Sequence, residues 1–167
     1  MTAASWVWRR MEPGDVASVS AIARIVHPSF PEDDAVFAER VALYPAGCRM
    51  LVGDADAPQG YVLSHPWRGA PPKLNSFLRI LPVPDVYYIH DLSVLPAQRG
   101  AGAASQGVRD LLAQARGEGM SRAALVAVNH SVPFWSRLGF AIADDPAMRR
   151  ALASYGDDAR YMTMTLA

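Results

Sequence analysis

The sequence lacks several features that would point at once to a class of protein. It has one cysteine, Cys48, in 167 residues, so no internal disulfide forms, and nothing suggests a zinc cluster or another metal site. Its 16 basic and 16 acidic side chains cancel, so no overall field attracts nucleic acid or an anionic membrane. No apolar run approaches the roughly 20 residues that span a bilayer, and the first residues lack the apolar core of a signal peptide. We therefore expect a cytoplasmic protein with neither nucleic-acid nor membrane partners, in which any affinity for anions comes from a specific site.

The composition that remains is typical of a folded, globular domain. Hydrophobic residues make up 51% of the chain and charged residues 19%, which favours a packed core over disorder. The length suits about one domain, and no linker or repeat divides the chain. We therefore predict a single domain over residues 1–167.

The hydrophobic pattern alternates between strand and helix periodicity along the chain. It predicts strands at residues 6–11, 48–54, 60–67, 87–95, 122–128, 139–144 and 159–166, and helices at 12–26, 31–44, 102–116, 131–138 and 146–155. Residues 67–86 are rich in proline and predict an inserted loop, with one helical turn in the apolar segment 74–81. Because strands joined by short turns run antiparallel, we expect an α/β fold with a mixed, mostly antiparallel central sheet flanked by helices.

One stretch, "HDLSVLPAQRGAGAASQGVRDLLAQA" at residues 90–115, joins a strand to a helix through a loop of small residues. The first turn of a helix has free N–H groups and a partial positive charge, and small residues leave these amides uncovered for a phosphate. Ser105 adds a hydroxyl on the same turn. The other interpretation is a plain strand-to-helix turn. The loop has neither the lysine of a P-loop nor the third spaced glycine and downstream acid of a dinucleotide fingerprint.

At these residues the sequence resembles the GNAT superfamily of acetyl-CoA-dependent N-acetyltransferases. Arg99, Gly102 and Ala104 fit the family's pyrophosphate loop, Arg/Gln-x-x-Gly-x-Gly/Ala, and residues 92–94 fit the Leu-x-Val of the preceding strand. "FWSRLGF" at residues 134–140 contains the family's Leu-Gly-Phe, and the predicted order of elements matches the family over essentially the whole chain.

The resemblance implies that acetyl-CoA lies in a split between the fourth and fifth strands, residues 87–95 and 122–128. The pantetheine would then pair with the backbone of Leu92, Ser93 and Val94, in the manner of an added strand. The pyrophosphate would lie on the loop and first turn formed by Gln98, Arg99, Gly100, Ala101, Gly102, Ala103, Ala104 and Ser105. Asn129 and Trp135 are further cofactor candidates, although Arg99 also suits a cover for the loop, Asn129 a turn residue and Trp135 the core.

The implied reaction is transfer of an acetyl group to a primary amine by direct attack, for which the amine must lose a proton. Strict alternation predicts that one face of the fourth strand carries Tyr88, His90, Leu92 and Val94, with Asp91 on the other face. Histidine is the side-chain type best matched to proton transfer near pH 7, so His90 is the predicted general base, with Tyr88 as a relay or donor. A core histidine is the alternative for His90, and a structural cap or ion-pair partner is the interpretation preferred for Asp91.

The chain departs from the family at the usual general acid, since Trp135 stands where many members have tyrosine. The indole N–H is not an acid near neutral pH, so a non-catalytic CoA-binding regulatory domain is the alternative function.

The acceptor site is predicted from the segments that close over the split. Its candidate residues are Phe30, Glu32, His65, Trp67 and Phe77, although acids at a helix N-terminus are often merely solvated and aromatic residues in a proline-rich loop often pack locally. The sequence does not choose between a small-molecule and a protein amine, and it leaves open whether the chain forms a homodimer.

Overall fold

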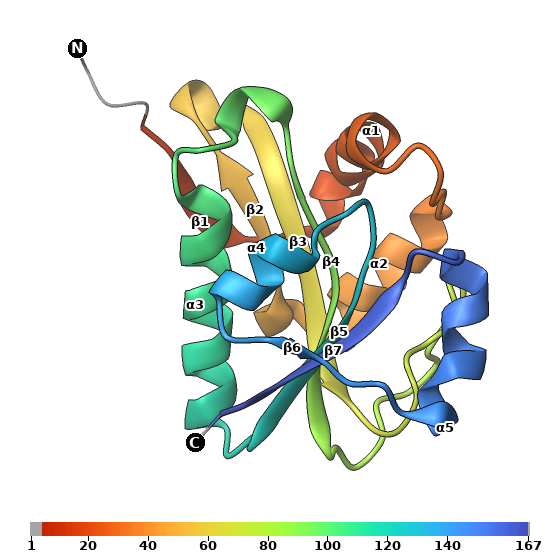
Figure 1. The fold of residues 1–167 in the computed structure, drawn as a ribbon. Coiled ribbons are helices and arrows are strands. Elements are labelled where there is room, and N and C mark those ends of the chain that lie inside the picture. The colour runs from red at the N-terminus through yellow and green to blue at the C-terminus, as the bar shows by residue number, and fades with distance from the viewer. Residues whose placement is uncertain (1–4, 167) are drawn as a thin grey trace.

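A computed structural model describes residues 5–166 and shows a central twisted sheet with helices on both faces (Figure 1). Its strands are β1 (Val7–Arg10), β2 (Cys48–Val52), β3 (Pro58–Trp67), β4 (Val86–Val94), β5 (Arg122–Ala127), β6 (Ala141–Ile142) and β7 (Arg160–Thr165). Its helices are α1 (Val16–Val26), α2 (Asp34–Leu43), α3 (Ala103–Gly117), α4 (Val132–Arg137) and α5 (Pro146–Arg149). Within this part of the chain, no helix is both long enough and apolar enough to cross a bilayer.

The strands form one sheet in the order β1-β2-β3-β4-β5-β7-β6. All neighbouring strands are antiparallel except β4 and β5, which run parallel, so the predicted mixed, mostly antiparallel α/β fold is confirmed. The β4–β5 pairing covers only Tyr87, Tyr88 and Ile89 of β4. Beyond Ile89 the two strands separate, which gives the split predicted between the fourth and fifth strands.

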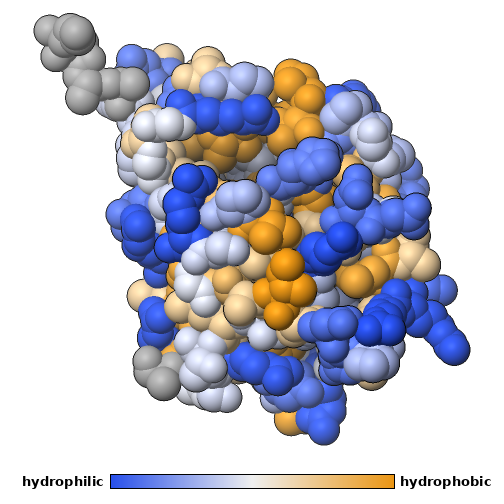
Figure 2. Space-filling view, viewed as in Figure 1, coloured by the Kyte–Doolittle hydropathy of each residue, from blue (hydrophilic) through white to orange (hydrophobic). Residues whose placement is uncertain are grey.

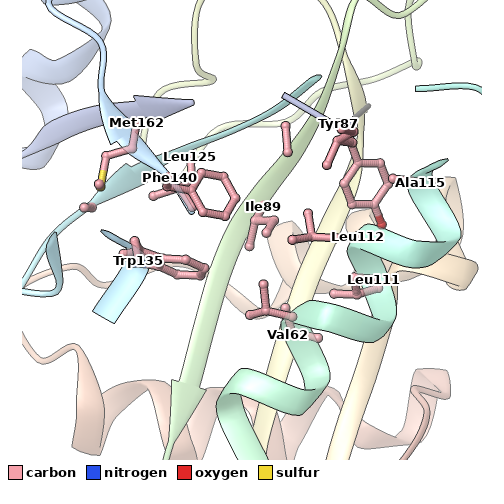
Figure 3. Close-up of a cluster of buried hydrophobic side chains, with 14 residues drawn as sticks. Val62, Tyr87, Ile89, Leu111, Leu112, Ala115, Leu125, Trp135, Phe140 and Met162 are labelled. Carbon is pink, nitrogen blue, oxygen red and sulfur yellow. The ribbon is translucent and has the colours of Figure 1, made fainter. Parts of the chain in front are cut away.

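The two faces of the sheet carry separate hydrophobic clusters. On one face, α3 packs Val108, Leu111 and Leu112 against strand residues that include Tyr87 and Ile89 (Figure 3). On the other face, α1 and α2 cover Met50, Tyr61 and Leu63. The helical spacing of apolar residues in α1 and α3 explains which side of each helix meets the sheet.

Helix α5 and the 3₁₀ helix that follows it cover a part of the sheet formed by β4, β5 and β7. Met148 in α5 and Leu152 in the following 3₁₀ helix (Arg150–Tyr155) pack with Tyr88 of β4 and Tyr161 of β7. The predicted helix at 146–155 is therefore α-helical only in its first turn.

The proline-rich insertion contains no helical turn at residues 74–81, so that prediction was wrong. The amides of Leu78 and Arg79 donate instead to the carboxylate of Glu39 on α2, at 2.6 and 3.0 Å. Asn75 and Arg79 also have positive φ values, of 56° and 69°, which a helix does not allow. The segment is thus shaped by contacts with α2 rather than by its own apolar spacing.

Candidate functional site

The fourth strand contains a β-bulge where it enters the split. Leu63 of β3 pairs with Asp91 and the next residue, Ser64, pairs with Ile89, so His90 has no partner on β3. An extra residue in one strand turns the side chains that follow it to the opposite face. The bulge therefore overturns the predicted strict alternation along β4.

The side-chain contacts on both sides of the bulge show the change of face. Leu92 packs into the cluster under α3, and Val94 packs against Ala103 at the start of that helix. Asp91 lies on the other face, where it accepts a hydrogen bond from Tyr61. His90 thus does not share a face with Leu92 and Val94, and Asp91 lies on the side of the sheet covered by α1 and α2.

A cleft of about 650 Å³ opens where β4 and β5 separate. It is bounded by β4, the loop after it, the first turn of α3, the end of β5 and helix α4. All the residues predicted to bind the cofactor line this cleft except Ser93 and Ala101. Hydrophobic surface is visible in the middle of the molecule, around the position of α4, with hydrophilic side chains around it (Figure 2).

The first turn of α3 presents bare backbone amides to this cleft. Gly100 and Gly102 have φ values of 84° and 82°, a left-handed conformation that favours glycine, and no atom lies within 4 Å of a Cβ built at either position. The amides of the first turn have no partner within the helix, and the helix dipole adds positive charge there. The loop therefore has the geometry and the charge that a pyrophosphate requires.

Three arginines add positive charge around the cleft. Arg99, Arg109 and Arg137 all line it, and within residues 5–166 none of them forms an ion pair. Of these three arginines, only Arg99 was predicted from the sequence to bind the cofactor. Arg109 was detectable in principle, because it lies four residues after Ser105 and so on the same side of α3. The cleft thus combines a helix N-terminus with free cationic side chains.

A second group that sequence analysis missed is His27, the residue that caps the C-terminal end of α1. Its Nε2 lies 3.1 Å from Oδ1 of Asp91, and its Nδ1 lies 2.7 Å from Nδ2 of Asn129. His27 therefore connects α1, β4 and the turn after β5 across the cleft. The signal available in the sequence was its place close before Phe30 and Glu32, two of the residues predicted for the acceptor site.

The surroundings of His27 and Asp91 favour a charged pair. Burial alone lowers the pKa of His27, but the hydrogen bond and negative charge of Asp91 outweigh it and raise the pKa. Burial raises the pKa of Asp91, and the hydrogen bond and charge of His27 outweigh this and lower it. Asp91 also accepts hydrogen bonds from Tyr61 and from Ser93 Oγ, the latter at 3.2 Å, so its carboxylate is held in place.

The predicted base, His90, lies beside this pair and has a carboxylate of its own. Its Nε2 is 2.8 Å from Oε1 of Glu32, and the two side chains are only 1% and 4% exposed. Among residues 5–166 the buried Nδ1 of His90 has no hydrogen-bond partner. Burial raises the pKa of Glu32, but the charge and hydrogen bond of His90 lower it overall.

None of the five predicted acceptor residues is part of the cleft lining, although two of them contact histidines that are. Glu32 binds His90, and Phe30 meets the ring of His27 edge-on at 6.3 Å. His65 packs against Tyr88 and meets Trp67 edge-on, and burial lowers the pKa of His65 to about 3.

Two other aromatic residues have different surroundings. Phe77 also lies outside the cleft, on the insertion, and is 51% exposed. Trp135 lines the cleft and packs edge-on against Phe140, at 5.6 Å (Figure 3). It also packs edge-on against Phe134, at 5.0 Å. The ring of Trp135 is therefore part of the hydrophobic core.

The split sheet and the bare helix terminus define a class of protein, which the sequence comparison identifies. The profile of the Acetyltransferase (GNAT) family matches residues 17–140, so the chain belongs to this family. The acyl donor of this family is acetyl-CoA. The bare amides and the arginines of the cleft fit the negatively charged phosphates of that molecule. No match was found among curated protein sequences.

Solved structures share this fold at low sequence identity. Ard1 from Thermoplasma volcanium is 18% identical, with a TM-score of 0.72 over 97% of this chain and 98% of its own. The ribosomal-protein-S18-alanine N-acetyltransferase from Escherichia coli is 14% identical, with a TM-score of 0.68 over 98% and 95%. N-acetylglutamate synthase from Neisseria gonorrhoeae, complexed with coenzyme A and N-acetyl-glutamate, is 18% identical, with a TM-score of 0.73 over 98% of this chain and 36% of its own.

Proposed function

We propose that this protein is an N-acetyltransferase that moves an acetyl group from acetyl-CoA to a primary amine by direct attack. The observation that carries the proposal is the cleft, in which the bare first turn of α3 lies beside a stretch of β4 that has no neighbour on its β5 side. Acetyl-CoA supplies an activated thioester. Membership of the family makes acyl transfer the class of reaction, and we propose that the acceptor is an amine.

The backbone of β4 would hold the pantetheine and polarise the thioester. In the part of the chain that the structure describes, β4 beyond Ile89 is paired only with β3, so its other edge can bind an extended chain as a further strand would. The amide of Val94 is the candidate donor to the carbonyl oxygen, because a fixed N–H there would stabilise negative charge developing on that oxygen. The amides at the start of α3, together with Arg99, Arg109 and Arg137, would hold the phosphates.

The sequence predicts His90 as the general base and Tyr88 as a relay or donor, and both are candidates for proton transfer. The hydrogen bond between Nε2 of His90 and Glu32 leaves a lone pair on Nδ1, although that atom is buried. Tyr88 lies next to His90, with ring centroids 6.3 Å apart. Trp135 cannot supply the acid, so the leaving thiol would take its proton from elsewhere or leave as thiolate.

The acceptor class rests on the carboxylates around the cleft and on the solved neighbours. Asp91 lines the α1 side of the cleft and Glu32 lies behind His90, so two carboxylates lie near the place where an amine would bind. Two of the similar structures belong to an S18-alanine N-acetyltransferase and an N-acetylglutamate synthase, whose names point to a protein and an amino-acid acceptor. Both kinds of acceptor therefore belong in the first substrate panel.

The test is a steady-state assay that follows free thiol with acetyl-CoA and a panel of peptide, amino-acid and polyamine acceptors. Sustained thiol release that depends on one amine, with the acetylated product found by mass spectrometry, supports the proposal. Tight binding of CoA without turnover on any amine would instead support the alternative, a CoA-binding regulatory domain.

A further inference from the structure

We propose that His27, held by Asp91, is the residue that contacts the acceptor amine and takes its proton. This inference rests on the proposed N-acetyltransferase function and assigns the direct contact with the amine to a residue outside β4. Its basis is the geometry of three side chains, His27, Asp91 and Asn129, which meet in the cleft from three separate parts of the chain.

His27 stands in the cleft wall next to the bulge of β4. It lines the cleft together with Asp91, Leu92 and Asn129, and its side chain is 14% exposed. The backbone of Leu92 is one of the positions expected to pair with the pantetheine, and His27 lies next to it, so His27 lies beside the proposed path of the cofactor. By contrast, the His90 side chain is 1% exposed and its free Nδ1 is buried.

The hydrogen bonds of His27 fix which ring nitrogen accepts a proton. Because Nε2 faces the carboxylate of Asp91, Nε2 carries the proton, and the Nδ1 of the neutral ring is then an acceptor. Nδ1 lies 2.7 Å from Nδ2 of Asn129, an NH₂ group. The site is therefore shaped for a nitrogen donor at hydrogen-bond distance, and an acceptor amine would take the place of the Asn129 amide.

In the proposed step the nitrogen of the neutral amine forms its bond to the acetyl carbon and gives one proton to Nδ1 of His27. The carbon–sulfur bond breaks, and the proton on His27 passes to the thiolate or to solvent. Asp91 keeps the ring in the productive tautomer and stabilises the imidazolium that forms, which is the role of the orienting carboxylate in other carboxylate–histidine pairs. Tyr61 and Ser93 in turn hold Asp91.

The pH dependence follows from the charged groups around His27. Asp91 and Glu32 both raise its pKa, and His90 interacts with both of these carboxylates. Since the neutral ring is the active form, kcat/KM should rise with pH through a pKa above the usual value of about 6.5. With Asp91→Asn the largest raising contribution is lost, so this acidic limb should move to lower pH.

The experiment compares His27→Gln, His90→Gln and Asp91→Asn with wild-type protein, and His130→Asn serves as the matched control. His130 is an exposed histidine in the turn after β5 and lies outside the cleft lining, so its replacement should leave kcat/KM unchanged. We expect His27→Gln to lower kcat/KM by about 100- to 1000-fold, within the usual range of general-base effects, and to abolish the acidic limb. Its affinity for acetyl-CoA, measured by calorimetry, should stay within about twofold of wild type.

Two results would overturn the assignment. One is an acidic limb that persists in His27→Gln and disappears in His90→Gln. The other comes from an NMR titration of the His27 ring, which needs no turnover: the same pKa in wild type and Asp91→Asn would show that Asp91 does not control His27. If the proposed N-acetyltransferase function itself is wrong, wild-type protein will bind acetyl-CoA but acetylate no amine.

Discussion

Replacement of Gly102 by glutamate should abolish acetyl-CoA binding while the fold survives. Gly102 precedes α3 with a φ of 82°, and no atom lies within 4 Å of a Cβ at this position, so a side chain there would point into open space. The backbone conformation costs a non-glycine residue roughly 1–2 kcal/mol. For a chain of this size that free energy corresponds to a fall in Tm of only a few degrees.

The effect on binding is expected to be much larger because of charge. A carboxylate about 4 Å from one phosphate charge, at an effective dielectric constant of about 20, is repelled by about 4 kcal/mol. That energy corresponds to roughly a 1000-fold loss of affinity, before the second phosphate is counted. The loss should shrink at high salt, because an exposed loop is screened.

The assay is calorimetric titration with acetyl-CoA, with thermal melting of each variant. Gly102→Ala isolates the backbone cost, and Gly102→Gln adds the bulk of glutamate without its charge. We expect affinity to fall slightly for alanine, moderately for glutamine and beyond detection for glutamate. Equal affinities for the glutamate and glutamine variants would refute the idea that this loop binds the pyrophosphate.

Three further predictions concern residues elsewhere in the site and the core. His90→Ala should leave the acidic limb of the pH–rate profile and the acetyl-CoA affinity in place, because His27 is the proposed base; a fall in kcat/KM of about 10- to 1000-fold with loss of that limb would return proton transfer to His90. Trp135→Tyr should give no gain in kcat at pH 7 or pH 9, because Trp135 is a core residue; a tenfold gain confined to pH 7 would show that a missing acid limits the enzyme. Gly107→Ala should destabilise the fold by about 1–3 kcal/mol in denaturant titration, since its Cβ would lie 2.6 Å from the ring of Trp8.

The sequence by itself determined the order of the elements and the nature of the loop before α3. Both depend on local physics: hydrophobic spacing selects strand or helix, and glycine at positions 100 and 102 is what a left-handed turn requires. The resemblance to the family rested on the same short segments, and the fold and the family profile confirmed it. Most of the cofactor residues predicted from these local patterns line the cleft.

Only the tertiary structure decided which side chains meet in the site. The bulge at His90 arises from the pairing of β4 with β3, and it moved Asp91 to the face where His27 lies. His27 and Asn129 are 102 residues apart in sequence, and Glu32 and His90 are 58 apart. Contacts at such separations depend on strand register and helix packing over the whole domain, which no local pattern encodes.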